Sequence, residues 1–579
     1  MSALLSIKNL SIQFSNDGEL STAVKKISFD VAPGEIVAIV GESGSGKSVT
    51  ALSILQLLPV QSRIKGEILF YKKNSSPVNL LQLPVEQLNA IRGRDISMIF
   101  QEPMTSLNPV ITCGKQVMES IRLHQKISKK AARLLTIGLF ERVKLPEPSS
   151  MIHRYPHQLS GGQKQRVMIA MAMSSNPALL IADEPTTALD VTVQKTILEL
   201  IRGLQVQHNM GVIFITHDLG VVADIADAII VMYKGEIVEQ GKAGDLLKNP
   251  QHPYTKALLA CRPASQPKGK RLPVVSDFMG APSVVIPATA LPADHLQEGY
   301  MNTEIVAHLP ETTPVLSVNE LTVSFPVRKN FFGHASKFFN AVDAVSFDVY
   351  KGETVGLVGE SGCGKSTLGR TILQLIKPNS GEIVLNGKDI TKINPVAFRH
   401  LRKNLQIVFQ DPYGSLNPRI TIGNAILEPL KVHDLFNSTK ERKEKVMEML
   451  EKVSLHADHF NRYPHQFSGG QRQRICIARA LALHPSFLIF DESVSALDVS
   501  VQAQVLNLLN DLKKEFGFTA IFISHDLSVV HYACNRIMVM HQGKIVEEGE
   551  AGQVYYHPKN DYTQRLIGAI PGRKPVPLN

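Results

Sequence analysis

Gly41-Glu42-Ser43-Gly44-Ser45-Gly46-Lys47-Ser48 is the stretch that decides the fold of this chain. Its glycines, spaced before Lys-Ser, are typical of a phosphate-binding loop, in which backbone N–H groups surround phosphate oxygens. An apolar run over 36–40 precedes the loop and a helical pattern over 48–58 follows it. This strand–loop–helix context predicts an α/β fold with an anion site at the start of the helix.

The same loop occurs a second time, as Gly359-Glu360-Ser361-Gly362-Cys363-Gly364-Lys365-Ser366, 318 residues later. Four further motifs follow each loop in the same order. The second copy of each motif stands 308 or 309 residues after the first copy. The motifs are a glutamine (Gln101, Gln410), Ser-Gly-Gly-Gln (160–163, 468–471), Asp-Glu (183–184, 491–492) and His-Asp (217–218, 525–526). A nearly constant period over this many motifs indicates a duplicated domain.

The repeat divides the chain into two similar halves and a connection. We expect a first domain over 1–262, with an extension near 245–262, and a second domain over 314–579. Between them, the segment 263–313 holds seven prolines and no clear hydrophobic period, so it is predicted to be a linker. A charged stretch with helical spacing over 119–143 predicts a small helical insert in the first domain.

The composition narrows the class of protein. Of 579 residues, 44% are hydrophobic and 20% are charged, as in globular proteins large enough for sizeable cores. The net charge is +10, but no block of five or more basic residues occurs and the chain has no Trp, so we expect no nucleic-acid partner. No two of the five cysteines lie within four residues, which excludes a local CxxC metal site and favours a reducing compartment.

The N-terminus lacks the basic and apolar regions of a signal peptide, and no run of about eighteen apolar residues occurs. We therefore expect the chain not to span a bilayer, so that any membrane role comes through partners.

The chemistry expected at each loop follows from the residue types. Lys47 and Lys365 would neutralise the β and γ phosphates, and the hydroxyls of Ser48 and Ser366 would ligate Mg²⁺. Each Asp-Glu pair closes an apolar strand, where the metal of a bound nucleotide lies in such folds. The first acid of each pair is expected at the metal and the second beside the water that attacks the γ-phosphate; these are Asp183, Glu184, Asp491 and Glu492.

Together these motifs resemble an ATP-binding-cassette (ABC) ATPase with two fused cassettes, and the resemblance covers the chain outside 263–313. The Ser-Gly-Gly-Gln motif matches the family signature. The resemblance implies an α/β fold of two P-loop NTPase cassettes, each with a RecA-like core, a helical subdomain and an antiparallel β subdomain. It also implies that each ATP lies between the loop of one cassette and the signature of the other.

The remaining roles come from the resemblance alone. The catalytic residues would be Glu184, His217, Glu492 and His525, with the two histidines near the γ-phosphate. Besides the two loops, the nucleotide-binding residues would be Gln101, Ser160, Gly162, Gln163, Asp183, Gln410, Ser468, Gly470, Gln471 and Asp491. The Mg²⁺ ligands would be Ser48, Gln101, Asp183, Ser366, Gln410 and Asp491. Asp190 and Asp498 match a loop that communicates across the cassette dimer.

Several stretches of the sequence indicate which branch of the ABC family the chain resembles. The residues 101–109, 410–418 and His252-Pro253-Tyr254-Thr255, with an echo at Asp561-Tyr562-Thr563, resemble importers of oligopeptides, dipeptides or nickel. Others, such as 121–125, look most like the ATP-binding subunits of glutathione importers. The resemblance implies two transmembrane permease subunits, an extracytoplasmic solute-binding protein, and a peripheral place on the cytoplasmic face of a bacterial inner membrane.

Two other classes stay open at this point. A soluble translation factor with tandem cassettes would carry a long charged helical linker, whereas this linker is rich in proline and weakly charged. A DNA-repair ATPase of the excision type would carry zinc-binding CxxC pairs, which this sequence lacks. Within the importers, glutathione, short peptides, nickel and other small solutes stay open.

The second copy departs from the family at two positions: Phe467 replaces the signature leucine and Ser493 replaces the proline found at Pro185. Neither change removes a catalytic group, so we expect two hydrolytically competent sites. Cys363 lies within the second loop, where a helix N-terminus can lower a thiol pKa. We state the hypothesis that this thiol reacts with alkylating agents and that nucleotide protects it.

Overall fold

The structure is a computed structural model, and it describes residues 3–16, 19–72, 76–101, 106–187, 189–280, 313–329, 335–495 and 497–572. It divides into two compact units. The first comprises Met1–Ala260, Val274–Ala288 and Pro571–Lys574, and the second comprises Cys261–Pro273, Thr289–Ile570 and Pro575–Asn579. Of the predicted linker, residues 281–312 lie outside the described part, and its boundaries stay a prediction.

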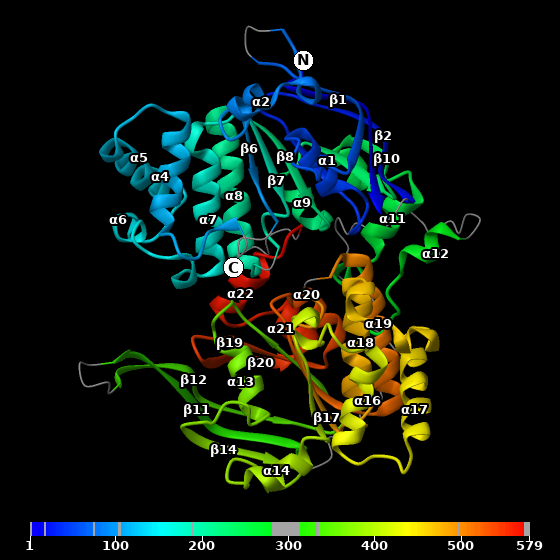
Figure 1. Cartoon of the computed structure of the whole chain (residues 1–579). Coiled ribbons are helices and arrows are strands. Elements are labelled where there is room, and N and C mark those ends of the chain that lie inside the picture. The colour runs from blue at the N-terminus through cyan, green and yellow to red at the C-terminus, as the bar shows by residue number, and fades with distance from the viewer. Residues whose placement is uncertain are drawn as a thin grey trace. The chain divides into compact units, whose positions relative to one another are not determined.

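Each unit contains a mostly parallel core sheet of six strands (Figure 1). In the first unit the strand order is β10 (Glu236–Lys242), β9 (Ala228–Tyr233), β3 (Ile36–Val40), β8 (Gly211–Thr216), β7 (Leu179–Asp183) and β6 (Ile96–Ile99). Strands β3, β7 and β8 are buried along their whole length, which explains their continuous apolar sequences. Only β10 runs antiparallel to its neighbour.

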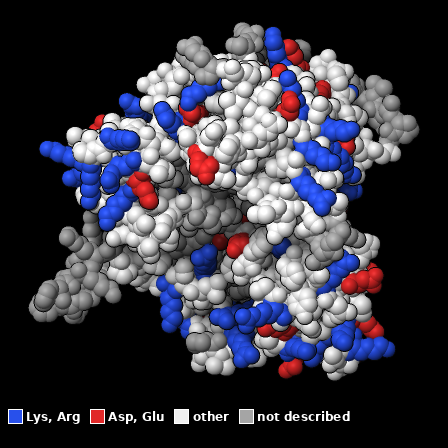
Figure 2. Space-filling view, turned by 45° about the horizontal axis from the view of Figure 1, so that its top comes forward, with Lys and Arg blue, Asp and Glu red and all other residues white. Residues whose placement is uncertain are grey.

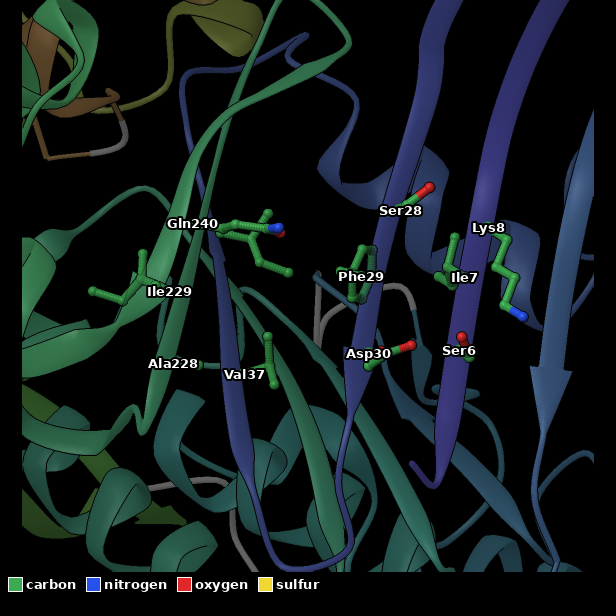
Figure 3. Close-up of a pocket in the computed structure, with 12 residues that line it drawn as sticks. Ser6, Ile7, Lys8, Ser28, Phe29, Asp30, Val37, Ala228, Ile229 and Gln240 are labelled. Atoms are coloured by element: carbon green, nitrogen blue, oxygen red, sulfur yellow. The ribbon is translucent and has the colours of Figure 1, made fainter. Parts of the chain in front are cut away.

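A second, antiparallel sheet of the first unit contains β2 (Glu19–Val31), β1 (Leu5–Asn16), β4 (Ser62–Phe70) and β5 (Val78–Asn79), in that order. Its apolar face shares one hydrophobic core with the core sheet. A cleft of about 560 Å³ opens where β1 and β2 approach β9 and β10, with Phe29 and Gln240 on its two sides (Figure 3). None of the residues that line this cleft is a predicted site residue.

Helices complete the first unit. The helix α1 (Lys47–Ile54) follows the phosphate loop, and α8 (Val191–His208) and α9 (Leu219–Ile225) follow strands of the core sheet. A helical group of α4 (Cys113–His124), α5 (Lys129–Arg142) and α7 (Gly161–Ala172) packs together, as predicted for this region. Shorter helices are α2 (Val85–Ile91), α6 (Pro148–Met151), α10 (Ala243–Lys248), α11 (Pro253–Ala260) and α12 (Val275–Met279).

The second unit repeats this plan. Its core sheet has the order β16 (Leu405–Val408), β17 (Phe487–Asp491), β18 (Thr519–Ile523), β13 (Thr354–Val358), β19 (Arg536–His541) and β20 (Lys544–Glu550). Its antiparallel sheet contains β12 (Ala335–Val349), β11 (Leu316–Lys329), β14 (Ser380–Leu385) and β15 (Lys388–Asp389). Its helices are α13 (Lys365–Ile372), α14 (Pro395–Leu401), α15 (Pro412–Ser415), α16 (Ile422–Val432), α17 (Thr439–Lys452), α18 (Gly469–Leu481), α19 (Val499–Phe516), α20 (Leu527–Ala533), α21 (Ala551–Tyr556) and α22 (Asp561–Gly568).

On the face drawn in Figure 2, Lys and Arg side chains are spread over the surface singly and in small groups, with fewer Asp and Glu side chains among them. A single basic stripe of the kind that follows a nucleic-acid backbone is not visible on that face. Among the described residues, no helix combines the length and the apolar character needed to cross a bilayer.

Candidate functional site

The phosphate loop of each unit folds around the ammonium group of its lysine. Lys47 Nζ donates to the carbonyl oxygens of Gly41 (2.8 Å) and Glu42 (2.9 Å). In the second unit Lys365 makes the same two bonds at 2.7 and 3.0 Å. The loop therefore has the curved backbone and buried cation that suit a polyphosphate.

The residues predicted for Mg²⁺ lie at the C-terminal edge of each core sheet. Ser48 Oγ donates to Asp183 Oδ1 at 3.0 Å, and Ser366 Oγ donates to Asp491 Oδ1 at 2.8 Å. A hydroxyl and a carboxylate side by side are the hard oxygen ligands that Mg²⁺ prefers. Two protein oxygens leave room for phosphate oxygens as further ligands of the same ion, so this donor set fits Mg²⁺ bound together with a nucleotide. In the described residues, no group of three or more His, Cys, Asp or Glu side chains is arranged to hold a metal.

The second acid of each Asp-Glu pair lies within contact distance of the predicted glutamine and histidine of its unit. Glu184 Oε2 accepts from Gln101 Nε2 at 3.1 Å, and Glu184 Oε1 lies 3.3 Å from His217 Nδ1. In the second unit Glu492 Oε2 accepts from Gln410 Nε2 at 2.9 Å and lies 3.5 Å from His525 Nδ1. The structure thus brings together residues that stand up to 116 positions apart in the sequence of the first unit and up to 115 in that of the second.

Both of these glutamates have a left-handed backbone, with φ of 45° at Glu184 and 48° at Glu492. Non-glycine residues adopt this region rarely and at an energetic cost, and such residues cluster at functional sites. In each case the backbone N–H donates to a carbonyl of the neighbouring strand, Ile215 at 3.0 Å or Ile523 at 2.9 Å, which holds the turn. The turn directs the acid out of the strand end and toward the glutamine and histidine.

The electrostatic environment shifts the pKa values of the two acids in each pair in opposite directions. Burial raises the pKa of Asp183 to about 6, and the neighbouring charge of Glu184 acts in the same direction. Burial would also raise the pKa of Glu184, but hydrogen bonds from His217 and Thr187 and the charges of His217 and Lys47 lower it to about 2. Asp491 and Glu492 show the same opposite directions, a raised and a lowered pKa, for related reasons.

The signature serines begin helices, as their sequence predicts. Ser160 Oγ accepts from Gln163 N at 3.3 Å while Gln163 Oε1 accepts from Ser160 N at 3.2 Å, and Ser468 and Gln471 repeat this capping box at the start of α18. At Gly162 and Gly470, an added Cβ would lie 2.5 Å from Val193 and 2.2 Å from Val501. The pairing of each signature with the nucleotide of the other cassette stays a prediction.

Two residues of the site were not predicted from the sequence, Thr187 and Arg370. Thr187 Oγ1 donates to Glu184 Oε2 at 2.9 Å, whereas its counterpart Ser495 donates to the backbone carbonyl of Glu492 at 2.7 Å. In the second unit only, Arg370 lies 3.9 Å from Asp491 Oδ2, where the first unit has Leu52 at the matching helix position. Two signals in the sequence could have found them. Thr187 and Ser495 are hydroxyl residues three positions after each Asp-Glu pair, and Arg370 follows the second phosphate loop at the position of Leu52 in the first copy.

The structure does not support the basis of the Cys363 hypothesis. The Cys363 side chain is buried, with 6% of the residue exposed, and burial raises the pKa of its thiol despite the nearby charge of Lys365. The local rule that a helix N-terminus lowers a thiol pKa is outweighed here by desolvation.

We therefore expect slow alkylation of Cys363 by N-ethylmaleimide in the folded chain without nucleotide, about tenfold or more below its rate in urea. Because a raised pKa leaves less thiolate at pH 7, the rate should increase as the pH rises toward that pKa. Peptide mapping of the labelled chain measures this rate. Fast labelling at pH 7 that ATP prevents would restore the original hypothesis.

Comparison with known proteins agrees with this geometry. The sequence model of the ABC transporter family matches residues 24–187 and 342–495, which together span more than half of the chain. The chain belongs to the ABC transporter family. The oligopeptide/dipeptide transporter C-terminal region matches residues 238–279. The two-cassette fold and the importer branch expected from the sequence are thereby confirmed.

Similar curated proteins extend over nearly the whole chain. It is 46% identical over 580 residues to the glutathione import ATP-binding protein GsiA of Pectobacterium atrosepticum, and 48% identical over 579 residues to that of Escherichia coli K12. Each alignment covers 99% of this chain and 90% of the relative. A solved dimeric structure of MJ0796, a bacterial ABC transporter cassette, is 28% identical and matches 41% of this chain and 98% of its own, with a TM-score of 0.37. As a member of the family, this ABC ATPase binds and hydrolyses ATP.

Proposed function

We propose that this chain is the ATP-hydrolysing subunit of an importer that carries glutathione or short peptides across a bacterial inner membrane. The observation that carries the proposal is the duplicated cluster around Glu184 and Glu492, in which glutamine, histidine and the Ser–Asp pair converge beside each phosphate loop. Similarity to GsiA proteins over 99% of the chain supports glutathione as the substrate. A general peptide or nickel importer is the alternative within the same branch.

In the proposed mechanism, Lys47 and the loop N–H groups would bind the phosphates, and Ser48 and Asp183 would hold Mg²⁺. The bound Mg·ATP supplies the electrophilic phosphorus and the charge neutralisation of its oxygens. Glu184, ionised because of its low pKa, orients the attacking water, and Gln101 and His217 hold the carboxylate in place. Lys365, Ser366, Asp491 and Glu492 act alike in the second cassette. ATP binding favours a closed cassette pair and hydrolysis reopens it.

Coupling to two permease subunits would pass through the glutamines. In the second unit a cavity of about 1110 Å³ opens beside Gln410, with the apolar side chains of Phe409 and Val432 on its wall. A helix about 10 Å across fits a cavity of this size. Because Gln410 also donates to Glu492, a permease helix seated there is one hydrogen bond from the catalytic carboxylate. The chain would sit on the cytoplasmic face of the membrane and receive solute through an extracytoplasmic binding protein.

Uptake of labelled glutathione, and separately of a labelled short peptide, tests the proposal. Cells that carry Glu184→Gln/Glu492→Gln should lose glutathione uptake, because transport requires turnover at the proposed sites. The matched control is Glu199→Gln/Glu451→Gln, the same chemical change at two exposed helix positions, which should leave uptake unchanged. A fall in peptide uptake alone would make the chain a general peptide-importer ATPase, and no change in either would contradict both substrate assignments.

A further inference from the structure

A tyrosine hydroxyl from the C-terminal extension contacts the phosphate loop in each unit. Tyr254 Oη accepts a hydrogen bond from the backbone N–H of Glu42 at 2.9 Å, and Tyr562 Oη accepts one from Glu360 N–H at 3.0 Å. Glu42 and Glu360 occupy the second position of their loops. The two bonds join segments that are 212 and 202 residues apart in sequence.

Both tyrosines are held rigidly. Tyr254 is fully buried, and its ring packs on Tyr233 with centroids 4.3 Å apart. Tyr562 is 6% exposed, and its ring stacks on His541 at 3.9 Å. Tyr233 and His541 are the last residues of β9 and β19. Each hydroxyl is therefore fixed against the core sheet, so it can constrain the loop N–H that it binds.

A glutamate fastens the start of each tyrosine helix to the neighbouring strand. Glu239 accepts from the backbone N–H groups of Gln251 (2.7 Å) and His252 (3.1 Å), just before α11. Glu547 accepts from Lys559 and Asn560 at the same two distances, just before α22. In both units, then, a glutamate binds the start of a helix, and the tyrosine of that helix binds the phosphate loop. The contact therefore belongs to the common structure of the two cassettes, and the family model of the importer C-terminal region matches the extension of the first.

We propose that Tyr254 and Tyr562 are positioning residues through which the C-terminal extension of each cassette sets the ATP affinity of that cassette's own phosphate loop. The inference rests on the proposed ATP sites and assigns to the extension a regulatory contact with them. The hydroxyl fixes one N–H of the loop away from the phosphates, so the remaining N–H groups are held in the anion-binding arrangement before ATP arrives. Movement of the extension would release that N–H and lower the affinity.

Tyr254→Phe and Tyr562→Phe test this in the full chain, because each removes one oxygen atom and keeps the ring. Tyr233→Phe is the matched control, since it removes a phenol hydroxyl from the same aromatic pair without touching Glu42 N–H. The probe is 8-azido-ATP with Mg²⁺, and peptide mapping of the photolabel reports each cassette separately. ATPase assays and thermal unfolding are measured on the same preparations.

We expect Tyr254→Phe to raise the half-saturating nucleotide concentration of the first cassette by about threefold to tenfold, the usual effect of removing one hydrogen bond. Tyr562→Phe should do the same in the second cassette only. Turnover at saturating ATP should stay unchanged, and the unfolding temperature should fall by roughly 2–4 °C, the cost of about one buried hydrogen bond. Tyr233→Phe should match the unchanged chain in nucleotide half-saturation and in turnover. A KM effect without a kcat effect separates positioning from general loss of structure.

The inference is overturned if Tyr254→Phe and Tyr233→Phe behave alike, or if turnover falls while half-saturation is unchanged. It is also overturned if either tyrosine variant weakens both cassettes equally. Absence of photolabel from both cassettes of the unchanged chain would contradict the proposed ATP sites and this inference together. Normal labelling that the variants do not alter would contradict the inference alone.

Discussion

Replacing Glu184 and Glu492 together by glutamine is expected to lower ATPase turnover by about a thousandfold while ATP binding is retained. Glutamine keeps the size of the side chain and an oxygen that can accept from Gln101 or Gln410. It loses the negative charge, and because the pKa of Glu184 is about 2, that charge is present throughout the physiological pH range. What the substitution removes is thus the anion that orients and polarises the water.

Steady-state phosphate release and equilibrium ATP binding measure the two parts of this prediction. The control is again Glu199→Gln/Glu451→Gln, which should match the unchanged chain in both assays. If turnover of the double variant stays within a few-fold of the unchanged chain, neither glutamate acts on the water. If ATP binding is lost as well, the acids act chiefly in binding.

The single variants examine whether both sites hydrolyse ATP. Each should lower turnover by half or more, because each removes one of two sites. The sites differ in detail, since Thr187 donates to the carboxylate of Glu184 whereas Ser495 donates to the backbone of Glu492. A single variant with undiminished turnover would identify its site as one that does not hydrolyse ATP.

The core of the fold was predictable because its determinants are local and repeated. The runs over 36–40 and 179–183 form buried parallel strands, and Ser160 caps a helix as its motif indicates. The partners of β1 were not predictable in the same way: β1 pairs with β4, about fifty residues further along the chain. Such pairings are decided by packing against the core sheet, which no local pattern encodes.

In the site, too, features set by local sequence could be predicted, whereas features set by contacts between distant segments could not. Lys47, Ser48, Asp183 and Glu184 could be placed from motif and strand position alone. The left-handed backbone of Glu184 could not, because it depends on the hydrogen bond to Ile215 in a neighbouring strand. The hypothesis for Cys363 rested on the lowering of a thiol pKa by a helix terminus, which is visible in the sequence, whereas burial, which is not visible there, raises the pKa of this thiol.

Gly364→Ala is expected to destabilise the second cassette by about 3 kcal/mol or more and to abolish its ATP binding. Gly364 has a φ of +111°, a region that side chains with a Cβ rarely adopt. An added Cβ would also lie 2.0 Å from the carbonyl oxygen of Ala341, which belongs to strand β12. Because that oxygen is backbone within a paired strand, the loop must move instead, and Lys365 moves with it.

Gly362→Ala separates the two contributions. Gly362 also has a left-handed φ, of +83°, but nothing lies within 4 Å of an added Cβ. It should cost about 1 kcal/mol of backbone strain, or roughly 2–4 °C in unfolding temperature, against roughly 6–12 °C for Gly364→Ala. Differential scanning fluorimetry of the two variants measures the difference. Equal shifts would mean that backbone strain alone sets the cost and that the contact with Ala341 relaxes freely; a larger shift for Gly364→Ala would show that β12 fixes the shape of the phosphate loop.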